Sequence, residues 1–545
     1  MKRKHFGSIL ADKTVYILLS VSILGFILYP YLSIFIQSFQ EQGIAFSAFI
    51  RQDAVLLQHS LFIAILTMVL TVFMSLTLAI FFVFLKSKWQ KPLRLFLLVT
   101  MVSPPFVTSL AYITLFGRRG MITHDLLNLT FNPYGAHGII LMETLSFTSL
   151  NALVLIGMLH QLEPAVINSA RSLGAKSDAV IRDMILPLLR PGVIVVALIS
   201  FIRSLADFQT PTIIGGSYRV LASEGYFAVI SAGDLHRAAL INFTLCIPAL
   251  LGFFLYIHYE HTMTTQHHGL SSDTNALPLP KKGWFFPVTC CLAVIFYGAL
   301  LLQYGSILIN AVTVKNMGQL TFSWQPLLDS RMYLDGTILR TVSYALVAGF
   351  VGSLISFLII YYSQIRQSRW MNLIELIGTF PYILPGTFFG LGYLYAFSGQ
   401  YFHLTNLSII VIINVTFKQV AFATKAAKAA VAQVEPTYFK TVHDLGGTVL
   451  NEWHDVFFPM TRQGFALTFL NGFISTMTTI GSIIFLIRPG QKVMTIVMFD
   501  VVQRGEYQIA SVIACLIILI CLIMAGLVFG ILGLKQRRWL HVSRS

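Results

Sequence analysis

A few ionisable side chains inside long apolar segments are the residues of this chain that could carry chemistry. They are Glu143, Arg203, Asp207, Glu375 and Lys418. A charged group inside a bilayer is costly, so such residues usually face a cavity or a partner. We expect Glu143 to be a paired structural carboxylate. We expect Glu375 and Lys418 to reach the membrane interface from the ends of their segments.

A cluster of histidines and one glutamate has the side-chain types of a metal site, because imidazole and carboxylate are common metal ligands. Its members are His258, Glu260, His261, His267 and His268. The cluster lies in a polar stretch rich in Ser, Thr and Pro, which provides no rigid frame. We therefore interpret it as part of a solvated linker and predict no metal site.

The sequence lacks the signatures of an enzyme. It contains no Gly-x-x-x-x-Gly-Lys-Ser/Thr motif, so no P-loop for ATP is predicted. No nucleophile stands in a recognisable context of base and acid. The five cysteines are without the spacing of a zinc site or a disulfide framework, and we expect them to be buried structural thiols. They are Cys246, Cys290, Cys291, Cys515 and Cys521.

Composition places these residues in a membrane protein. Of the 545 residues, 56% are hydrophobic and 11% are charged, whereas soluble domains carry about 25% charged residues. Apolar runs recur with the length of about 20 residues that crosses a bilayer as a helix. We predict an all-α polytopic protein with twelve spans. They lie near 14–36, 59–85, 95–116, 138–159, 192–213, 238–259, 284–310, 338–362, 371–397, 404–424, 464–487 and 508–534.

The net charge of +15 does not indicate a nucleic-acid partner. The basic residues collect in short loops on one side of the predicted spans, as they do in cytoplasmic loops of membrane proteins. This distribution predicts that both termini lie in the cytoplasm. The N-terminus lacks a small-residue cleavage site and is expected to be a retained anchor.

One polar stretch occurs twice, each time between apolar runs. The first copy runs from Glu163 to Gly192 and the second from Glu435 to Gly464, with a single offset of 435 − 163 = 272 residues. Identical residues lie in register at eight positions: Glu163/Glu435, Pro164/Pro436, Leu173/Leu445, Gly174/Gly446, Asp183/Asp455, Pro187/Pro459, Arg190/Arg462 and Gly192/Gly464. A repeat at a fixed period indicates two equivalent halves.

The repeat divides the chain into a first half (1–259), a linker (260–283) and a second half (284–545). We name the repeated segments loop A (160–191) and loop B (425–463). Each half has six predicted spans, an even number, so both loops face the cytoplasm. The halves are therefore parallel repeats related by a pseudo-twofold axis along the membrane normal.

Glycine and proline predict the local structure of the repeated loops. In loop A, residues Asn168 to Leu173 are helix-compatible, and Gly174 would end that helix in a left-handed turn. A second short helix is predicted from Ser177 to Met184, with Pro187 and Pro191 ending it and starting the next span. The result would be a helix-turn-helix on the cytoplasmic face, able to pass force from a partner to the spans.

The spacing small-small-x-x-x-Gly, nine residues, apolar-x-x-Pro resembles the "EAA" loop of binding-protein-dependent (type I) ABC importer permeases. In loop A this pattern is formed by Ser169, Ala170, Gly174, Met184 and Pro187, and in loop B by Thr441, Val442, Gly446, Val456 and Pro459. Both loops depart from the family at the acidic position, which is Asn168 in one and Lys440 in the other.

Four further stretches resemble the fused, two-domain permeases of ferric-iron importers. They are Ser103–Gly120, Leu205–Gly216, Tyr218–Ile230 and Ser475–Gly490. The resemblance implies a type I permease in the bacterial cytoplasmic (inner) membrane that forms a translocation path for ferric iron. Relatives of the same branch carry phosphonates, sugar phosphates or thiamine. A twelve-helix secondary transporter driven by ions is the alternative from another class.

The resemblance also implies partners and sites. ATP and Mg²⁺ would be bound by a partner ABC ATPase, expected to be a homodimer, so that this chain holds no cofactor and is no enzyme. An extracytoplasmic binding protein would deliver the substrate. ATPase coupling would involve Glu163, Ala170, Gly174, Asp183, Pro187, Glu435, Gly446, Asp455 and Pro459.

Two further sets of residues have two interpretations each. Asp207 would line the path, together with Pro105 and Pro385 in the Pro-bearing spans, or would be a helix-end charge near the interface. Arg118 and Arg119 would contact the binding protein, or would be solvated loop charges.

Overall fold

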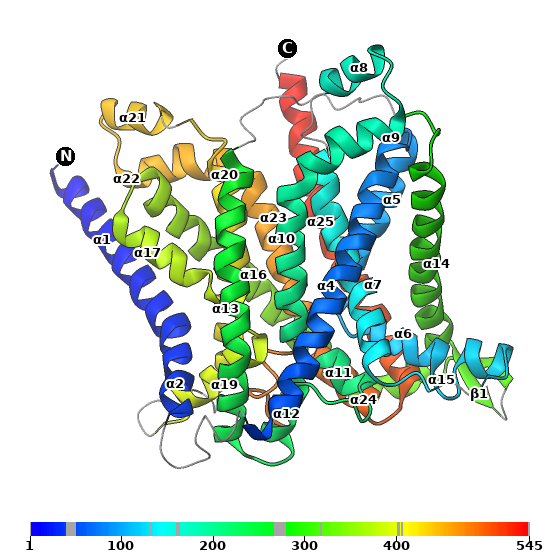
Figure 1. Cartoon of the computed structure of the whole chain (residues 1–545). Coiled ribbons are helices and arrows are strands. Elements are labelled where there is room, and N and C mark those ends of the chain that lie inside the picture. Colours follow the sequence, from blue (N-terminus) through cyan, green and yellow to red (C-terminus); the bar gives the residue numbers. More distant parts are fainter. Residues whose placement is uncertain are drawn as a thin grey trace. The chain divides into compact units, whose positions relative to one another are not determined.

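The computed structural model describes the chain except for residues 1, 40–50, 130–131, 160–163, 266–278, 317–318, 400–403, 405–406, 436 and 543–545. The chain forms two compact units. Unit 1 comprises Met1–Gly43, Arg331–Val497 and Leu516–Ser545, and unit 2 comprises Ile44–Ser330 and Met498–Cys515. Figure 1 labels their helices and strands.

The described residues confirm the all-α polytopic prediction. Nine helices are long and apolar enough to cross a membrane, and the pair Arg369–Tyr382 and Gly386–Phe397, bent by 111°, would be a tenth span. The nine are Leu10–Ser38, Ala54–Val83, Ala136–Leu159, Ser177–Ala206, Leu235–Tyr256, Phe285–Ala311, Thr337–Ile365, Ile409–Val431 and Tyr507–Leu532. The two other predicted spans correspond to α5 and α6, which are separated around the Pro104–Pro105 pair, and to α23.

Unit 2 is built on α4, which packs against α7 and α10. Its α-helices, π-helices (η) and strands are α4 (Ala54–Val83), α5 (Ser87–Thr100), α6 (Val107–Phe116), η2 (Met121–Leu126), α7 (Ala136–Leu159), α8 (Pro164–Ser172), α9 (Ser177–Val180), η3 (Ile181–Ile185), α10 (Leu186–Ala206), α11 (Gln209–Ile214), α12 (Leu221–Ile230), α13 (Leu235–Thr265), α14 (Phe285–Ala311), β1 (Thr313–Asn316) and β2 (Gln319–Phe322). The two strands pair antiparallel.

Unit 1 is built on α16, which packs against α20 and α23. Its elements are α1 (Lys2–Ile23), η1 (Leu24–Leu28), α2 (Tyr29–Ser38), α16 (Thr337–Ile360), η4 (Tyr361–Ile365), α17 (Arg369–Gly378), α18 (Phe380–Ile383), α19 (Gly386–Phe397), α20 (Ile409–Val431), α21 (Thr437–Asp444), α22 (Val449–Asn451), η6 (Glu452–Phe457) and α23 (Phe458–Thr478). Residues of α15 (Gln325–Leu334), α24 (Met494–Gln503) and α25 (Tyr507–Val542) fall in both units.

Small and hydroxyl-bearing residues allow the helices within each unit to pack closely. Thr67, Thr71 and Ser75 follow one another at every fourth residue of α4 and are fully buried. In unit 1, a Cβ added to Gly472 of α23 would lie 3.0 Å from the Cα of Gly349 on α16. Helices in lipid associate through such close contacts, because burial of apolar side chains gives little driving force there.

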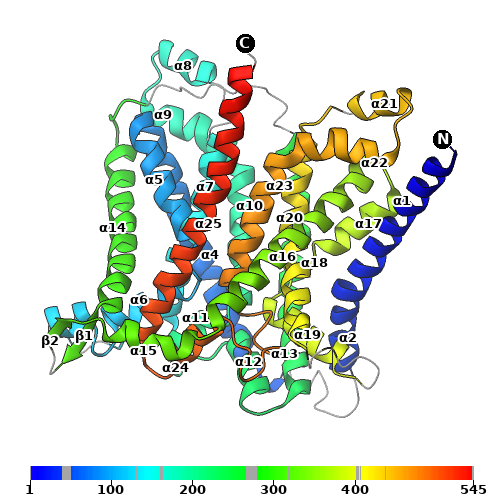
Figure 2. The same ribbon diagram turned by 180° about the vertical axis from the view of Figure 1, so that it is seen from behind.

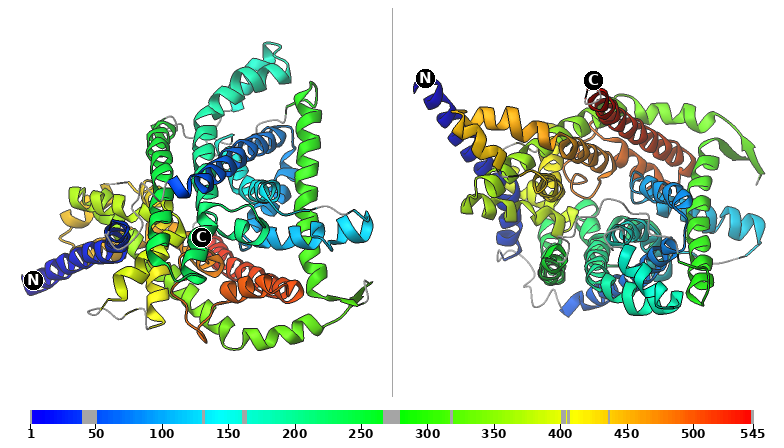
Figure 3. Two further views of the ribbon diagram at one scale, coloured as in Figure 1. Left: turned by 60° about the horizontal axis from the view of Figure 1, so that its bottom comes forward. Right: turned by 90° about the horizontal axis from the view of Figure 1, so that it is seen from above.

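The first span of each sequence half packs with helices of the other half. The first span of the second half, α14, belongs to unit 2, and the first span of the first half, α1 to α2, belongs to unit 1. In unit 2, α14 packs against α4 and α6 (Figure 2), and Gln303 Nε2 donates to Thr108 Oγ1 at 3.0 Å. In unit 1, α1 packs against α17 and α2 against α19 (Figure 3), and Tyr393 Oη donates to the Phe26 carbonyl at 2.7 Å. The compact units thus differ from the sequence halves in their first helix and in Met498–Cys515, which belongs to unit 2.

Two predicted boundaries lie elsewhere in the structure. The helix after Gly174 does not end at Pro187 or Pro191 but continues from Ser177 to Ala206 as one span. Proline cannot donate to the preceding turn, and the π-helical turn η3 just before Pro187 accommodates the missing bond. Helix α13 continues to Thr265, six residues into the predicted linker, because no Gly or Pro precedes Gly269 there.

Candidate functional site

The repeated loops have the same backbone structure in both units. In unit 2, α8 ends at Gly174, which adopts φ +88°, and in unit 1, α21 ends at Gly446, which adopts φ +76°. The Ala175 N–H donates to the Ala170 carbonyl at 3.1 Å, and the Gly447 N–H donates to the equivalent Val442 carbonyl at 2.8 Å. These bonds are those of a Schellman C-cap, which needs a left-handed residue. The predicted glycine turn is confirmed.

Each loop lies at one end of its unit. In unit 2, α8 and α9 lie at the end opposite to α6 and α11 (Figure 1). In unit 1, α21 and α22 lie at the end opposite to α19 and α2 (Figure 2). Each loop is therefore in a position to contact a partner at that end of its unit.

A leucine just before each glycine is almost fully exposed. The side chain of Leu173 is 89% exposed and that of Leu445 is 83% exposed. The two are equivalent in the repeat, 445 − 173 = 272. A leucine that is exposed at the same place in two copies has no packing role within the described chain. This pair is the strongest sign of a docking surface, and the sequence pattern alone did not single it out.

Loop A is held to unit 2 mainly by apolar packing. Val180 and Ile181, at the start of the long helix, are 1% and 0% exposed and pack in a core cluster with Leu279. Ser177 Oγ donates to the Pro280 carbonyl at 2.9 Å, and the Trp284 N–H donates to Asp178 Oδ2 at 3.2 Å. The segment Leu279–Trp284, at the end of the linker, therefore holds loop A against its unit. We call this segment the strap.

We expect Gly283→Ala to weaken this strap. Gly283 adopts φ +98°, and an added Cβ would collide with the Asp178 carboxylate. Left-handed strain costs an L-residue about 1–2 kcal/mol, and the collision adds about 1–3 kcal/mol. The thermal unfolding midpoint of the purified protein measures the loss. Gly233→Ala is the matched control, because Gly233 has φ +65° and open space around it. Equal losses in the two variants would contradict the strap.

Loop B is held to unit 1 by an ionic cluster that the sequence analysis missed. Glu452, at the start of η6, is 2% exposed and accepts a hydrogen bond from Tyr361 Oη at 2.8 Å. Arg366 Nη2 lies 3.2 Å from the same carboxylate, and Arg366 Nε donates to Tyr361 Oη at 3.1 Å. The equivalent of Glu452 in loop A is the apolar Val180, 452 − 272 = 180. The two loops are thus anchored by different interactions.

The other residues predicted for coupling lie on the exposed sides of the loops. Asp183 is paired with Arg182 at 2.7 Å, and Asp455 is bonded to His454 at 2.7 Å. The bonds from His454 and then Asn451 lower the pKa of Asp455. Both carboxylates are more than half exposed, so these local pairs stabilise the fold little.

The remaining residues predicted for ATPase coupling are mostly exposed. Ala170 is half-buried, while Glu435, Pro187 and Pro459 are exposed, the prolines in the first turns of α10 and α23. Glu163 lies outside the described residues. The loops therefore offer backbone shape and the exposed leucines more than a concentrated charge.

Asp207 occupies the end of α10, as one of its two interpretations requires. Its carboxylate accepts from the Gln209 N–H at 2.9 Å and from Thr210 Oγ1 at 2.6 Å, and so it caps the turn into α11. Pro105 is exposed between α5 and α6, whereas Pro385 is buried as the N-cap of α19. A role for these three residues in a path stays a prediction.

The intramembrane charges have local partners. Glu143 is 1% exposed and accepts a hydrogen bond from Ser204, as predicted for a paired carboxylate. The prediction that Lys418 reaches the interface is wrong, whereas the same prediction for Glu375 stays a prediction. Glu375 pairs with Lys428 at 3.0 Å, and Lys418, in the middle of α20, donates to Thr479 Oγ1 at 2.8 Å.

The structure describes little of the predicted histidine cluster but all five cysteines. Only His258 of the histidine cluster has a described side chain, which is exposed, and the described residues hold no group of three or more metal-ligating side chains. All five cysteines are free, as expected, but only Cys246 and Cys521 are buried. Cys291 is exposed on a membrane-spanning helix, because helices in lipid turn apolar side chains outward.

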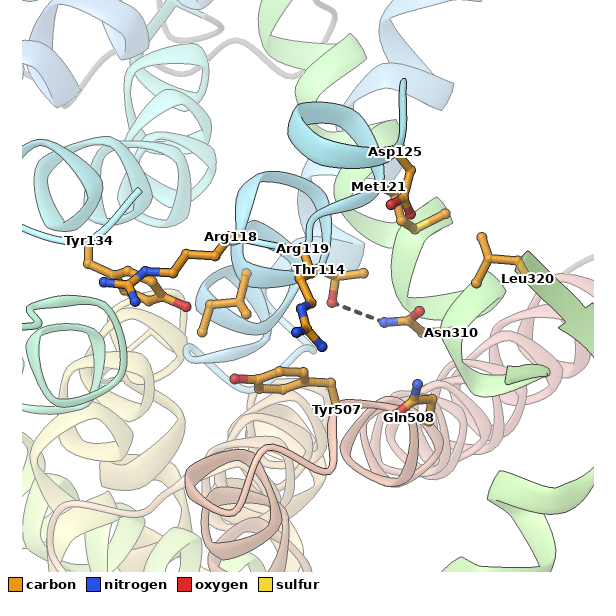
Figure 4. Close-up of a pocket in the computed structure, with 12 residues that line it drawn as sticks. Thr114, Arg118, Arg119, Met121, Asp125, Tyr134, Asn310, Leu320, Tyr507 and Gln508 are labelled. Carbon is orange, nitrogen blue, oxygen red and sulfur yellow. Dashed lines mark hydrogen bonds between the residues drawn. The ribbon is translucent and has the colours of Figure 1, made fainter. Parts of the chain in front are cut away.

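Arg118 and Arg119 lie in unit 2 at the end opposite to loop A, in the turn after α6. Both side chains are exposed and line a cavity of about 360 Å³ (Figure 4). The other lining residues include Asn310, Tyr507 and Gln508, which lie far from the arginines in the sequence. Only the tertiary fold brings these side chains together, so the sequence could suggest the arginines but not the cavity.

Comparison with known proteins agrees with this geometry. Residues 71–262 match the family model of the binding-protein-dependent transport system inner membrane component. The ferric transport system permease protein FbpB of Actinobacillus pleuropneumoniae is 28% identical over 527 residues, which cover 92% of this chain and 75% of that protein. A putative ferric transport system permease of Haemophilus influenzae is 27% identical, over 86% and 77%. The molybdenum transport permease ModB of Escherichia coli K12 is 29% identical over 33% of this chain and 85% of its own length.

The matches to the two ferric transport permeases extend over both halves of the sequence, and the model match covers the region of loop A. The chain therefore belongs to the inner-membrane permeases of binding-protein-dependent ABC importers, in the fused two-domain form. It is a multi-pass inner-membrane protein. Permeases of this family lack an ATPase site of their own.

Proposed function

We propose that this chain forms the translocation path of an ATP-driven importer of ferric iron. Two relatives that cover most of the chain are named as ferric transport permeases, and this supports the cargo. The observation that carries the mechanism is the pair of exposed leucines, Leu173 and Leu445, each just before the same left-handed glycine turn. Family membership sets aside the ion-coupled secondary transporter.

In this proposal both termini and both loops are cytoplasmic. Each loop inserts its short helix and leucine into one subunit of a partner ATPase dimer, which binds ATP and Mg²⁺. Loop A and loop B continue directly into membrane spans through η3–α10 and η6–α23. Movement of a docked ATPase subunit would therefore act on a span without a flexible joint. A binding protein delivers the substrate at the opposite ends, and the protein alternates between inward-open and outward-open states.

Uptake of radiolabelled ferric iron tests the cargo. Cells that express this permease with its cognate ATPase and binding protein should accumulate the label. An excess of molybdate, phosphonate, sugar phosphate or thiamine should leave the rate unchanged. Competition by one of these compounds, with no ferric uptake, would overturn the ferric assignment and leave the permease assignment intact. The matched control is the same strain with a catalytically inactive ATPase.

A further inference from the structure

The cavity at the end of unit 2 opposite to loop A is assembled from parts of the chain that lie far apart in the sequence. The end of α6 and the turn after it provide Thr114, Arg118 and Arg119, and α14 provides Asn310. The start of α25 adds Tyr507 and Gln508 (Figure 4). Ligand pockets have volumes of about 300–1,000 Å³, so a cavity of about 360 Å³ suits a small molecule or one side chain.

The two arginines point to different walls of the cavity. The Arg118 guanidinium lies 6.0 Å from the centre of the Tyr134 ring, and Arg119 extends toward Tyr507 (Figure 4). Stacking on an aromatic ring fixes a guanidinium and leaves its N–H groups free to bind a ligand. The phenol of Tyr507 and the amide of Gln508 add neutral donors beside them. These donor types suit a ligand with several negatively charged oxygens.

The frame of the cavity is rigid. Asn310 is 7% exposed, and its Nδ2 donates to Thr114 Oγ1 at 3.0 Å, which joins α14 to α6. The turn that carries the arginines is closed by two bonds of 2.8 Å, from Gly117 N to Ile113 O and from Gly120 N to Gly117 O. A Cβ at Gly117 would collide with the Ile113 carbonyl, so the turn requires glycine. The arginines are therefore presented on a fixed backbone.

The charge of the cavity is not neutralised within the described residues. Asp125 is the one acidic residue in its lining, and Asp125 Oδ1 already lies 2.8 Å from His124 Nδ1. No ion pair to a carboxylate is found for Arg118 or Arg119 in the described part of the chain. Two positively charged side chains that line one cavity repel each other, and an anion bound in the cavity would relieve that repulsion.

We propose that this cavity binds an oxyanion, through Arg118 and Arg119 with Tyr507 and Gln508 as neutral partners. Carboxylate and phosphate groups match the planar donors of arginine and form its strongest hydrogen bonds. The anion comes either from a small free molecule or from a carboxylate side chain of the binding protein. Only the placement of the cavity on the extracytoplasmic side rests on the proposed function.

Two arms of one experiment distinguish these sources. In the first, the full-length permease in nanodiscs of neutral lipid is titrated calorimetrically with inorganic phosphate and with citrate. In the second, binding of the iron-loaded cognate binding protein to the same nanodiscs is measured with and without those anions. The double variant R118Q/R119Q removes both charges, while R119K keeps charge but loses the planar donor pair. R331Q is the matched control, because Arg331 is exposed on α15 and does not line the cavity.

The proposal predicts at least tenfold weaker binding in one of the two arms for R118Q/R119Q, an intermediate loss for R119K and none for R331Q. Loss in the first arm identifies a free anion, and loss confined to the second identifies a carboxylate of the binding protein. The proposal is overturned if R118Q/R119Q binds as the wild type does in both arms. An unchanged thermal unfolding midpoint shows that the variants are folded. Failure here leaves the ferric uptake test untouched.

Discussion

Replacing both Leu173 and Leu445 with aspartate is expected to abolish binding of the partner ATPase and to reduce ferric uptake to background. Both side chains are more than four-fifths exposed in the chain alone. Burial of a leucine at an interface contributes about 1.5–3 kcal/mol. Two sites together then account for about 3–6 kcal/mol, which is about a hundredfold to ten-thousandfold in affinity. Co-purification of the ATPase with the tagged permease measures the loss.

The single variants make the test more precise. If the two loops bind equivalent grooves, Leu173→Asp and Leu445→Asp should each reduce ATPase binding, and the double variant should be the weakest. Leu126→Asp is the control, because that leucine is 72% exposed and lies in η2, at the end of unit 2 opposite to loop A. Normal ATPase binding by the double variant, with a normal unfolding midpoint, would refute docking through the loops.

The fold class and the position of the loops could be predicted from the sequence, because both depend on local patterns. Apolar runs of fixed length predict spans whatever their neighbours are. Gly174 and Gly446 predict turns because only glycine adopts positive φ without strain. The repeat shows the same local pattern twice, which strengthens the prediction for both loops.

What could not be predicted depends on contacts between distant segments. The sequence places Glu452 in a polar loop, yet Tyr361, at the end of the eighth predicted span, and Arg366, just after that span, enclose its side chain. The sequence predicts that Lys418 reaches the interface, because its hydrogen-bond partner Thr479 is 61 residues away and leaves no local signal. The packing of α1 and α14 outside their own halves follows no local signal at all.

The ionic anchor of loop B yields the second large effect, a loss of stability in Arg366→Leu. Glu452 would keep its burial of 98% and lose its ion pair with the guanidinium. Breaking a buried pair by removal of one partner costs about 3–5 kcal/mol. Glu452→Val should cost less, about 2–3 kcal/mol, because Arg366 is 32% exposed and can turn to water. The thermal unfolding midpoints of the purified variants give the order of their stabilities.

Loop A suggests the compensating change, because Val180 occupies the position of Glu452 there and is 1% exposed. The double variant Glu452→Val with Arg366→Leu should therefore be more stable than Arg366→Leu alone, since the buried carboxylate is removed together with its guanidinium. Arg219→Leu serves as control, because Glu224 keeps Arg237 at 3.3 Å when Arg219 is removed. If the double variant is as unstable as the sum of the single ones, the pair does not act as a unit. If it is stable and still binds the ATPase, the ionic anchor and the apolar anchor are interchangeable supports for the same loop.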